Sequence, residues 1–265
     1  MKKHKICKIL LVILAIFLCV AFYELLGICV AYKKQPEVSN TTKKETKNGS
    51  WNECSENTER AVIIEKNPEA LLQRVRLIKN AKKEIILSTF AFQSDESGKL
   101  ILGALHDAAD RGVHIRLLVD GMESWIDMEG NPYFYGLSSH ENVEIKLYNK
   151  ANPLKPWKMM GRMHDKYLIA DGKRYILGGR NTYNYFLGDF PGHKNYDRDV
   201  LVVCDEPEKE NSVNQLLEYF ETIWEQEDSG YFHDNKKLAN RKSVKNAVLE
   251  LQNGYQKYFE ENKED

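Results

Sequence analysis

A two-residue turn signal between two apolar runs constrains the fold of this 265-residue chain more than any other feature. Asp171-Gly172 separates residues 166–170 from residues 174–177, and an Asp-Gly pair supplies the positive φ values that a primed hairpin turn needs. The two runs are therefore expected to form adjacent antiparallel strands. Such a hairpin returns residues 178–181 to the side of the sheet where the first strand begins.

Several residues around this hairpin carry groups that suit a phosphate ligand. His164 and Lys166 are two positions apart, so on a strand their side chains project from one face and would meet the same ligand. The hairpin brings Asn181 beside them, and its amide can donate to a phosphoryl oxygen. Gly178 and Gly179 lack a Cβ, which lets a ligand approach the backbone closely. Together these residues predict a phosphoryl pocket.

The spacing closely resembles the HKD signature of the phospholipase D superfamily, His-x-Lys-x4-Asp-x6-Gly-(Gly/Ser)-x-Asn. Its fixed positions are occupied by His164, Lys166, Asp171, Gly178, Gly179 and Asn181. The alternative is a half-buried hairpin with a structural histidine, and the number of matched positions argues against it. The resemblance extends from residue 84 to residue 203 and implies a phospholipase D-like α/β domain.

The resemblance also implies a role for each catalytic residue. His164 is expected to attack phosphorus and form a phosphohistidine, while Lys166 and Asn181 neutralise the phosphoryl oxygens. Asp171 belongs to the catalytic signature, although it is expected to hold the hairpin and the site geometry more than to act on substrate. No metal and no cofactor are expected, because the ammonium and the imidazolium supply the positive charge.

An acidic residue near the last strand completes the expected site. In the family such a residue hydrogen-bonds the catalytic imidazole three positions before the apolar part of the strand. Asp197 is the better match, and Asp199 is the alternative. Gly178 and Gly179 are the expected substrate-binding residues.

The family's reaction uses two histidines, one to attack phosphorus and one to protonate the leaving oxygen, and they usually come from two HKD motifs. This sequence has one such motif. No second HKD pattern begins at any of the histidines beyond the apolar segment other than His164: His106, His114, His140, His193 and His233. The second histidine would come from a homodimer or from a second HKD-containing half of a longer enzyme.

Residues 1–32 form a separate unit. Four lysines within the first eight residues precede an apolar stretch from Ile9 to Ala31, which is long enough to cross a bilayer as a helix. We favour an uncleaved single-pass anchor over a signal peptide, because the stretch exceeds the usual apolar region of a signal. Lysines flank both ends, and the signal-like start favours a catalytic domain outside the cytoplasm.

The rest of the chain divides by pattern. Residues 33–59 are polar and lack apolar periodicity, which is typical of a flexible linker. Residues 60–228 alternate short strands with helices and predict the phospholipase D-like domain, with a mixed, mainly parallel sheet flanked by helices. Residues 229–265 predict a polar helical tail.

Two further features have modest weight. Asp120-Gly121 ends a predicted strand, where α/β sheets place ligands, although a simple turn is the commoner explanation. Several aromatic residues could line an acyl or base-stacking groove, although a core or loop-anchoring position is favoured for each: Phe90, Phe92, Trp125, Tyr133, Phe134 and Tyr135.

Charge bears on the substrate class. The formal net charge of -1 excludes a generally basic nucleic-acid binder. Five cationic residues nevertheless lie within residues 150–166, interleaved with Trp157 and three methionines. A solvated charged loop is one explanation, but basic and apolar residues together favour a phospholipid interface.

These patterns predict a membrane-anchored phospholipase D-type phosphodiesterase or phosphatidyltransferase of the cardiolipin synthase type, acting on phospholipids. One alternative keeps the chemistry and changes the substrate, as a homodimeric nuclease acting on nucleic acid. A second alternative is a non-catalytic, membrane-tethered protein that keeps half of an ancestral site.

Overall fold

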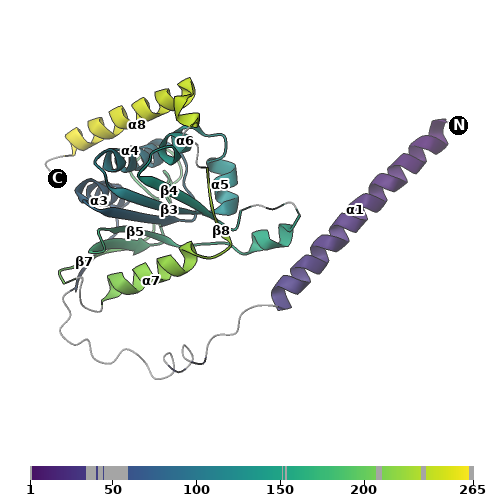
Figure 1. Cartoon of the computed structure of the whole chain (residues 1–265), viewed down its shortest axis with the longest axis horizontal. Coiled ribbons are helices and arrows are strands. Elements are labelled where there is room, and N and C mark those ends of the chain that lie inside the picture. The colour runs from purple at the N-terminus through teal and green to yellow at the C-terminus, as the bar shows by residue number, and fades with distance from the viewer. Residues whose placement is uncertain are drawn as a thin grey trace. The chain divides into compact units, whose positions relative to one another are not determined.

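The structure is a computed structural model that describes residues 2–33, 40, 44, 59–150, 152, 154–206, 211–233 and 237–262 (Figure 1). It divides into two units, Met1–Asn57 with Ala151–Gly161 and Thr58–Lys150 with Arg162–Asp265. The predicted linker at 33–59 lies almost entirely outside the described residues.

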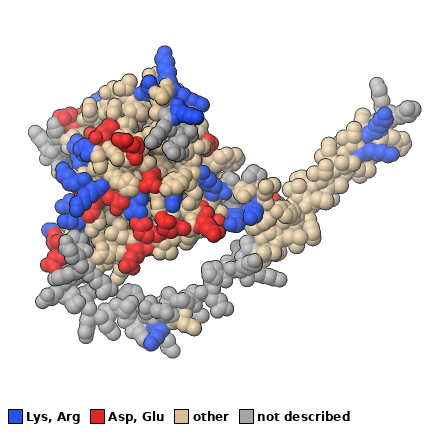
Figure 2. All heavy atoms as spheres, viewed as in Figure 1, with Lys and Arg blue, Asp and Glu red and all other residues tan. Residues whose placement is uncertain are grey.

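The first unit contains the long apolar helix α1 (Lys2–Lys33) and a short 3₁₀ helix, η1 (Pro156–Met160). Within α1, the span His4–Val30 contains an 18-residue window with a mean hydropathy of 2.9. Figure 2 shows tan, uncharged residues along α1, with lysines near its start. This helix is long and apolar enough to cross a membrane, and a signal sequence has the same properties.

One sheet of eight described strands organises the second unit, in the order β1-β7-β6-β5-β2-β3-β4-β8. The strands are β1 (Glu59–Ile64), β2 (Glu84–Thr89), β3 (His114–Asp120), β4 (Val143–Tyr148), β5 (Lys166–Ala170), β6 (Arg174–Gly178), β7 (Asp199–Cys204) and β8 (Ser229–Tyr231).

The sheet is mixed and flanked by helices, as predicted, but the expectation that it is mainly parallel is corrected. Only β2 with β3 and β3 with β4 pair in parallel among the described strands. The other five pairings are antiparallel. The strand–helix alternation that suggested parallel pairing holds up to β4. Beyond β4, a hairpin joins β5 to β6, a loop joins β6 to β7 and α7 lies between β7 and β8. All of these later strands pair antiparallel with their neighbours.

Helices cover both faces of the sheet (Figure 1). On one face, α3 (Asn67–Asn80), α4 (Glu96–Asp110) and α6 (Pro132–Ser138) pack on the main apolar core. On the other face, α7 (Ser212–Trp224) packs through Phe220 and Trp224 on a second core. Adjacent residues of β3 serve the two cores in turn, since Leu117 belongs to the first and Leu118 to the second. A short helix, α5 (Gly121–Asp127), follows β3 directly.

The predicted polar tail is helical and packs on the domain. After a 3₁₀ turn, η2 (Leu238–Asn240), helix α8 (Lys242–Glu261) buries Val244, Ala247, Leu251 and Tyr255. These side chains contact α4 and α6. The helix therefore belongs to the same compact unit as the sheet.

A buried ion cluster fastens β7 to its neighbours. Asp199, the first residue of β7, accepts a hydrogen bond from Arg74 Nη1 at 2.8 Å and lies 3.2 Å from Arg180 Nη1. All three side chains are buried. Arg180 also donates to two backbone carbonyls at the end of β1. One carboxylate thus neutralises two guanidinium groups that are shielded from water.

We predict that Asp199→Ala lowers the free energy of unfolding by about 3–5 kcal/mol, because it leaves two buried cations without their counter-charge. Denaturant titration of the full chain in detergent would measure the loss. Asp205→Ala is the matched control, since it removes an ion pair with Arg60 whose side chains are 52% and 73% exposed. That control is expected to cost less than about 1 kcal/mol, and equal losses would contradict the prediction.

Candidate active site

All but one of the predicted site residues gather at one edge of the sheet. Lys166 begins β5 there, Gly178 ends β6 and Asp199 begins β7, because β5, β6 and β7 pair antiparallel in sequence. His164 lies two residues before β5. The exception is Asp171, in the turn at the other end of β5.

His164 and Lys166 face each other, as their spacing predicted. Lys166 Nζ lies 3.2 Å from His164 Nδ1 and donates to the His164 carbonyl oxygen at 2.7 Å. Asp165, between them, turns to the other face, where its carboxylate accepts from the Tyr219 hydroxyl at 2.8 Å. His164 is exposed, whereas Lys166 is only 6% exposed. A ligand arriving from solvent would therefore meet the imidazole with an ammonium directly beside it.

Burial changes the acidity of this ammonium. The pKa of Lys166 is lowered, because removal from water disfavours the charged form, and the negative charges of Asp165 and Asp197 partly oppose the shift. Lys166 thus loses its proton at a lower pH than an exposed lysine does. A bound anion would counter this loss by stabilising the cation, so the site is electrostatically suited to a phosphate group.

Phe90 forms an apolar side of the site. It is half-buried directly after β2, and its ring packs on the His164 ring with centroids 4.5 Å apart. Lys166 Nζ and the Arg162 guanidinium lie 5.2 and 4.8 Å from the Phe90 centroid. Sequence reasoning favoured a core or loop-anchoring position for Phe90. The pairing of β2 with β5, which sets Thr89 opposite Lys166, brings it to the site instead.

Asn181 is fixed beside the end of β2. Its Oδ1 accepts from the Ala91 backbone N–H at 3.2 Å. The next residue, Thr182, donates its N–H to the Ala91 carbonyl at 3.0 Å. Because a backbone donor occupies Oδ1, the NH₂ group of the amide is directed away from Ala91. This orientation supports the predicted role of Asn181 as a donor to phosphoryl oxygen.

The two glycines make room for side chains of the protein itself. A Cβ at Gly178 would overlap the carboxylate of Asp199, and a Cβ at Gly179 would overlap that of Asp197. The sequence predicted that these glycines let a ligand approach the backbone, and the structure shows that each also makes room for a carboxylate of the protein. Contact of Gly178 and Gly179 with substrate stays a prediction.

The two candidate partners of the His164 imidazole, Asp197 and Asp199, lie in different surroundings. Asp199 belongs to the buried ion cluster, so its carboxylate serves the fold. Asp197 is exposed, accepts from the following backbone N–H at 2.7 Å and lies close enough for its charge to act on Lys166. Asp197 is therefore the carboxylate placed at the site, and its bond to His164 stays a prediction.

Asp171 lies at the far end of β5 from His164. Seven residues of extended chain separate them, on the order of 20 Å at about 3.3 Å per residue. The Asp171 carboxylate accepts from the backbone N–H groups of residues 82–84 at distances from 2.7 to 3.1 Å. Asp171 and Gly172 have φ values of 55° and 60°, as the primed turn requires. Asp171 thus ties the hairpin to the start of β2, in line with the expectation that it holds the hairpin more than it acts on substrate.

Asp120 holds the segment that leads into His164. It is 1% exposed at the end of β3. Its carboxylate accepts from the Met163 backbone N–H at 3.0 Å and from Arg162 Nε at 2.9 Å. It also accepts from two N–H groups that begin α5. The expected turn is present, but the carboxylate also positions the chain beside His164. No local pattern indicates this, because some 42 residues separate the partners.

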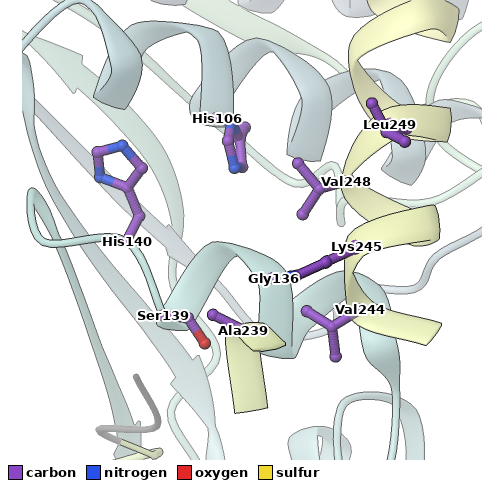
Figure 3. A pocket seen from close by; sticks show the side chains of 9 residues that line it. All are labelled: His106, Gly136, Ser139, His140, Ala239, Val244, Lys245, Val248 and Leu249. Atoms are coloured by element: carbon purple, nitrogen blue, oxygen red, sulfur yellow. The ribbon is translucent and has the colours of Figure 1, made fainter. Parts of the chain in front are cut away.

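A separate cleft of about 450 Å³ lies among α4, α6, η2 and α8 (Figure 3). Most of its wall is apolar, including Val244, Val248 and Leu249. At one side, His106 and His140 both hydrogen-bond Asp110, at 3.1 and 3.3 Å. None of the predicted site residues lines this cleft, so it is distinct from the His164 site.

Comparison with known proteins identifies the family. Residues 74–224, more than half of the chain, match the family model described as "Cardiolipin synthase, PLD-like domain". The chain belongs to the phospholipase D superfamily. The resemblance inferred from the HKD positions is thereby confirmed.

Curated relatives are longer than this chain. Cardiolipin synthase C of Escherichia coli K12 is 29% identical over 171 residues, which cover 59% of this chain and 34% of that protein. The chain spans less than two fifths of the length of that relative and of two further ones from Helicobacter pylori.

Solved structures share the fold. Phosphatidylserine synthase from Haemophilus influenzae Rd KW20 has a TM-score of 0.54 and 17% identity, covering 82% of this chain and 48% of that chain. NucT from Helicobacter pylori has a TM-score of 0.50 and 17% identity, covering 66% of this chain and 99% of that chain. At such identities the likeness confirms the α/β phospholipase D-like fold alone.

We predict that Asp120→Asn lowers kcat on a soluble phosphodiester by about 10- to 100-fold with little change in KM, because a small displacement of a catalytic group has effects of this order. The amide of the asparagine would direct an N–H toward one of the N–H groups from which the Asp120 carboxylate now accepts a hydrogen bond. Steady-state kinetics with bis(p-nitrophenyl) phosphate would measure this. Glu123→Gln is the matched control, since Glu123 also accepts from Arg162, at 2.9 Å. Equal effects of the two variants would contradict a positioning role for Asp120.

Proposed function

We propose that this chain is a membrane-anchored phospholipase D-type enzyme, a phosphodiesterase or phosphatidyltransferase that acts on phospholipids. The observation that carries the proposal is the contact between the exposed imidazole of His164 and the buried ammonium of Lys166. Asn181 and Asp197 lie at the same edge of the sheet. This set supplies a nucleophile, a cation and an amide donor for one phosphoryl group.

The chemistry proposed for His164 depends on which nitrogen of its ring carries the proton. A ring nitrogen can attack phosphorus only through a free lone pair, so attack by Nε2 requires the ring proton on Nδ1, with the Asp197 carboxylate as its proposed acceptor. A P–N bond forms and the bond from phosphorus to the leaving oxygen breaks, and that oxygen takes a proton from a second acid. Lys166 and Asn181 would stabilise the charge on the phosphoryl oxygens. Attack of water on the phosphohistidine gives hydrolysis, and attack of an alcohol gives transfer.

The second acid is proposed to come from another HKD motif. A homodimer would place a second His164 across one cleft, and a longer protein would supply a second half. The greater length of the curated relatives fits the second arrangement. The single motif within this sequence fits the first.

The substrate class is argued from the membrane segment and from charge. Helix α1 would hold the enzyme at the cell membrane as a single-pass anchor, with the domain outside the cytoplasm. On the visible face of the second unit, acidic and basic residues are interspersed (Figure 2). Nucleic acid prefers a continuous basic surface, so this distribution supports phospholipid as the substrate. A nuclease with the same chemistry is the alternative outcome.

We predict that the full chain converts phosphatidylglycerol in vesicles faster than it cleaves single-stranded DNA. Rapid quenching should trap an acid-labile, base-stable phosphohistidine. His164→Ala should abolish both trapping and turnover, because the nucleophile is lost. Lys166→Ala and Asn181→Ala should each cost on the order of 2.7–4 kcal/mol of transition-state stabilisation, by analogy with the loss of one oxyanion donor.

His233→Ala is the control in the same assays, since His233 pairs with Glu129 away from the HKD residues. Faster cleavage of DNA would replace the lipid substrate with nucleic acid. Wild-type turnover by His164→Ala would refute the catalytic assignment and favour the non-catalytic, membrane-tethered alternative.

We also predict that the His164→Ala chain lowers the activity of the wild-type chain if two copies share one active site. When equal amounts of the two chains exchange in detergent, a quarter of the dimers hold two wild-type copies, so the activity of a fixed amount of wild type should halve. His233→Ala chains should not reduce it. Unchanged activity after verified exchange would exclude a shared site in a homodimer.

A further inference from the structure

Helix α5 presents two large apolar side chains to solvent at the active-site edge of the sheet. Trp125 is 62% exposed and Ile126 is 65% exposed. They are five and six residues beyond Asp120, whose carboxylate binds the segment before His164. Figure 1 shows α5 at the end of the sheet that β3 reaches. Adjacent exposed residues of this size indicate contact with something other than water.

Two further exposed tyrosines lie on other segments that carry site residues. Tyr185 follows Asn181 by four positions and is 44% exposed, and Tyr196 directly precedes Asp197 and is 83% exposed. Three separate segments of the chain therefore expose aromatic or aliphatic side chains next to site residues. We name Trp125, Ile126, Tyr185 and Tyr196 the apolar rim.

The part of the rim on α5 is held in place by the same contacts that hold the site. Asp120 caps the helix through the backbone N–H groups of Met122 and Glu123, at 3.0 and 3.2 Å. Arg162 bridges Asp120 and Glu123, at 2.8 and 2.9 Å. The pair on α5 is thus presented by a capped helix that is fastened to the segment before His164. Anything that binds Trp125 and Ile126 is placed relative to the nucleophile.

We propose that the apolar rim docks on a lipid bilayer surface and sets the headgroup phosphodiester level with His164. This inference rests on the proposed function and deepens it, because it names how the lipid is met. Trp and Tyr rings suit the interface between headgroups and acyl chains. Ile126 adds an aliphatic group, which suits acyl chains and has no face on which a nucleobase stacks.

Because the membrane segment would anchor the chain, the apolar rim does not have to hold the protein on the bilayer by itself. Helix α1 has the length and composition of a membrane span, so an anchored domain would meet the bilayer at high effective concentration. Under that condition a few inserted side chains can orient the domain, even though they would bind a free protein to membranes only weakly. Lipid docking therefore needs no extended apolar face.

The test uses the full chain reconstituted into phosphatidylglycerol vesicles. The double variant Trp125→Ser/Ile126→Ser is expected to lower turnover of vesicle lipid by about tenfold, the order of one lost large apolar contact. It should leave hydrolysis of bis(p-nitrophenyl) phosphate, added to the same vesicles, unchanged. The matched control is Tyr231→Ser/Leu249→Ser, which removes one exposed aromatic and one exposed aliphatic residue, both 57% exposed, from β8 and α8.

A second readout does not depend on turnover. Brominated phosphatidylcholine quenches tryptophan that enters the bilayer, so wild-type fluorescence should be quenched more than that of Trp125→Tyr. Quenching without lipid turnover would support the docking surface and refute the proposed function. Equal quenching, or lipid turnover equally affected in both double variants, would overturn the docking surface. Loss of single-stranded DNA cleavage in Trp125→Ser/Ile126→Ser, without quenching of the wild type, would overturn it in favour of base stacking.

Discussion

The arrangement of the site depends on one desolvated cation, the guanidinium of Arg180. A buried guanidinium must have its charge balanced and its N–H groups bonded, because water cannot reach it. Its partners are Asp199 at the start of β7, two carbonyls at the end of β1 and the amide oxygen of Asn67 in α3. Because Arg180 lies between Gly179 and Asn181, these contacts hold both neighbours in place. The position of Asn181, the proposed donor to phosphate, thus depends on the buried contacts of its neighbour Arg180.

Most of the acidic side chains around the HKD motif have hydrogen-bond or ion-pair partners within the fold. Asp165 accepts from Tyr219, Asp199 balances two buried guanidinium groups and Asp171 accepts from three backbone N–H groups. Asp120 holds the segment before His164. Each of these carboxylates is bound within the fold, although the charge of Asp165 still acts on Lys166. Asp197 is exposed at the same edge of the sheet, and it remains the proposed partner of the imidazole.

The features that were predicted correctly from the sequence depend on short-range geometry. Alternation along β5 correctly set His164 and Lys166 together and turned Asp165 away, and the Asp171-Gly172 pair correctly predicted the hairpin. The roles of Phe90 and Asp120 depend on which strands become neighbours, and strand pairing is a long-range property. The same limit explains the sheet, because helix-connected strands up to β4 suggested more parallel pairing than the later strands provide. The space beside Gly178 is likewise filled by a strand that follows some 20 residues later.

The HKD residues at the two ends of β5 have different physical roles. One end carries the imidazole and the ammonium, and the other carries the carboxylate that joins the hairpin to the start of β2. Loss of that carboxylate would leave the chemistry of each folded molecule intact while reducing the number of molecules that fold. In a screen scored by total activity, Asp171 would then look like a catalytic residue. Dividing activity by the folded fraction would separate a defect of assembly from a defect of chemistry at the two ends of one five-residue strand.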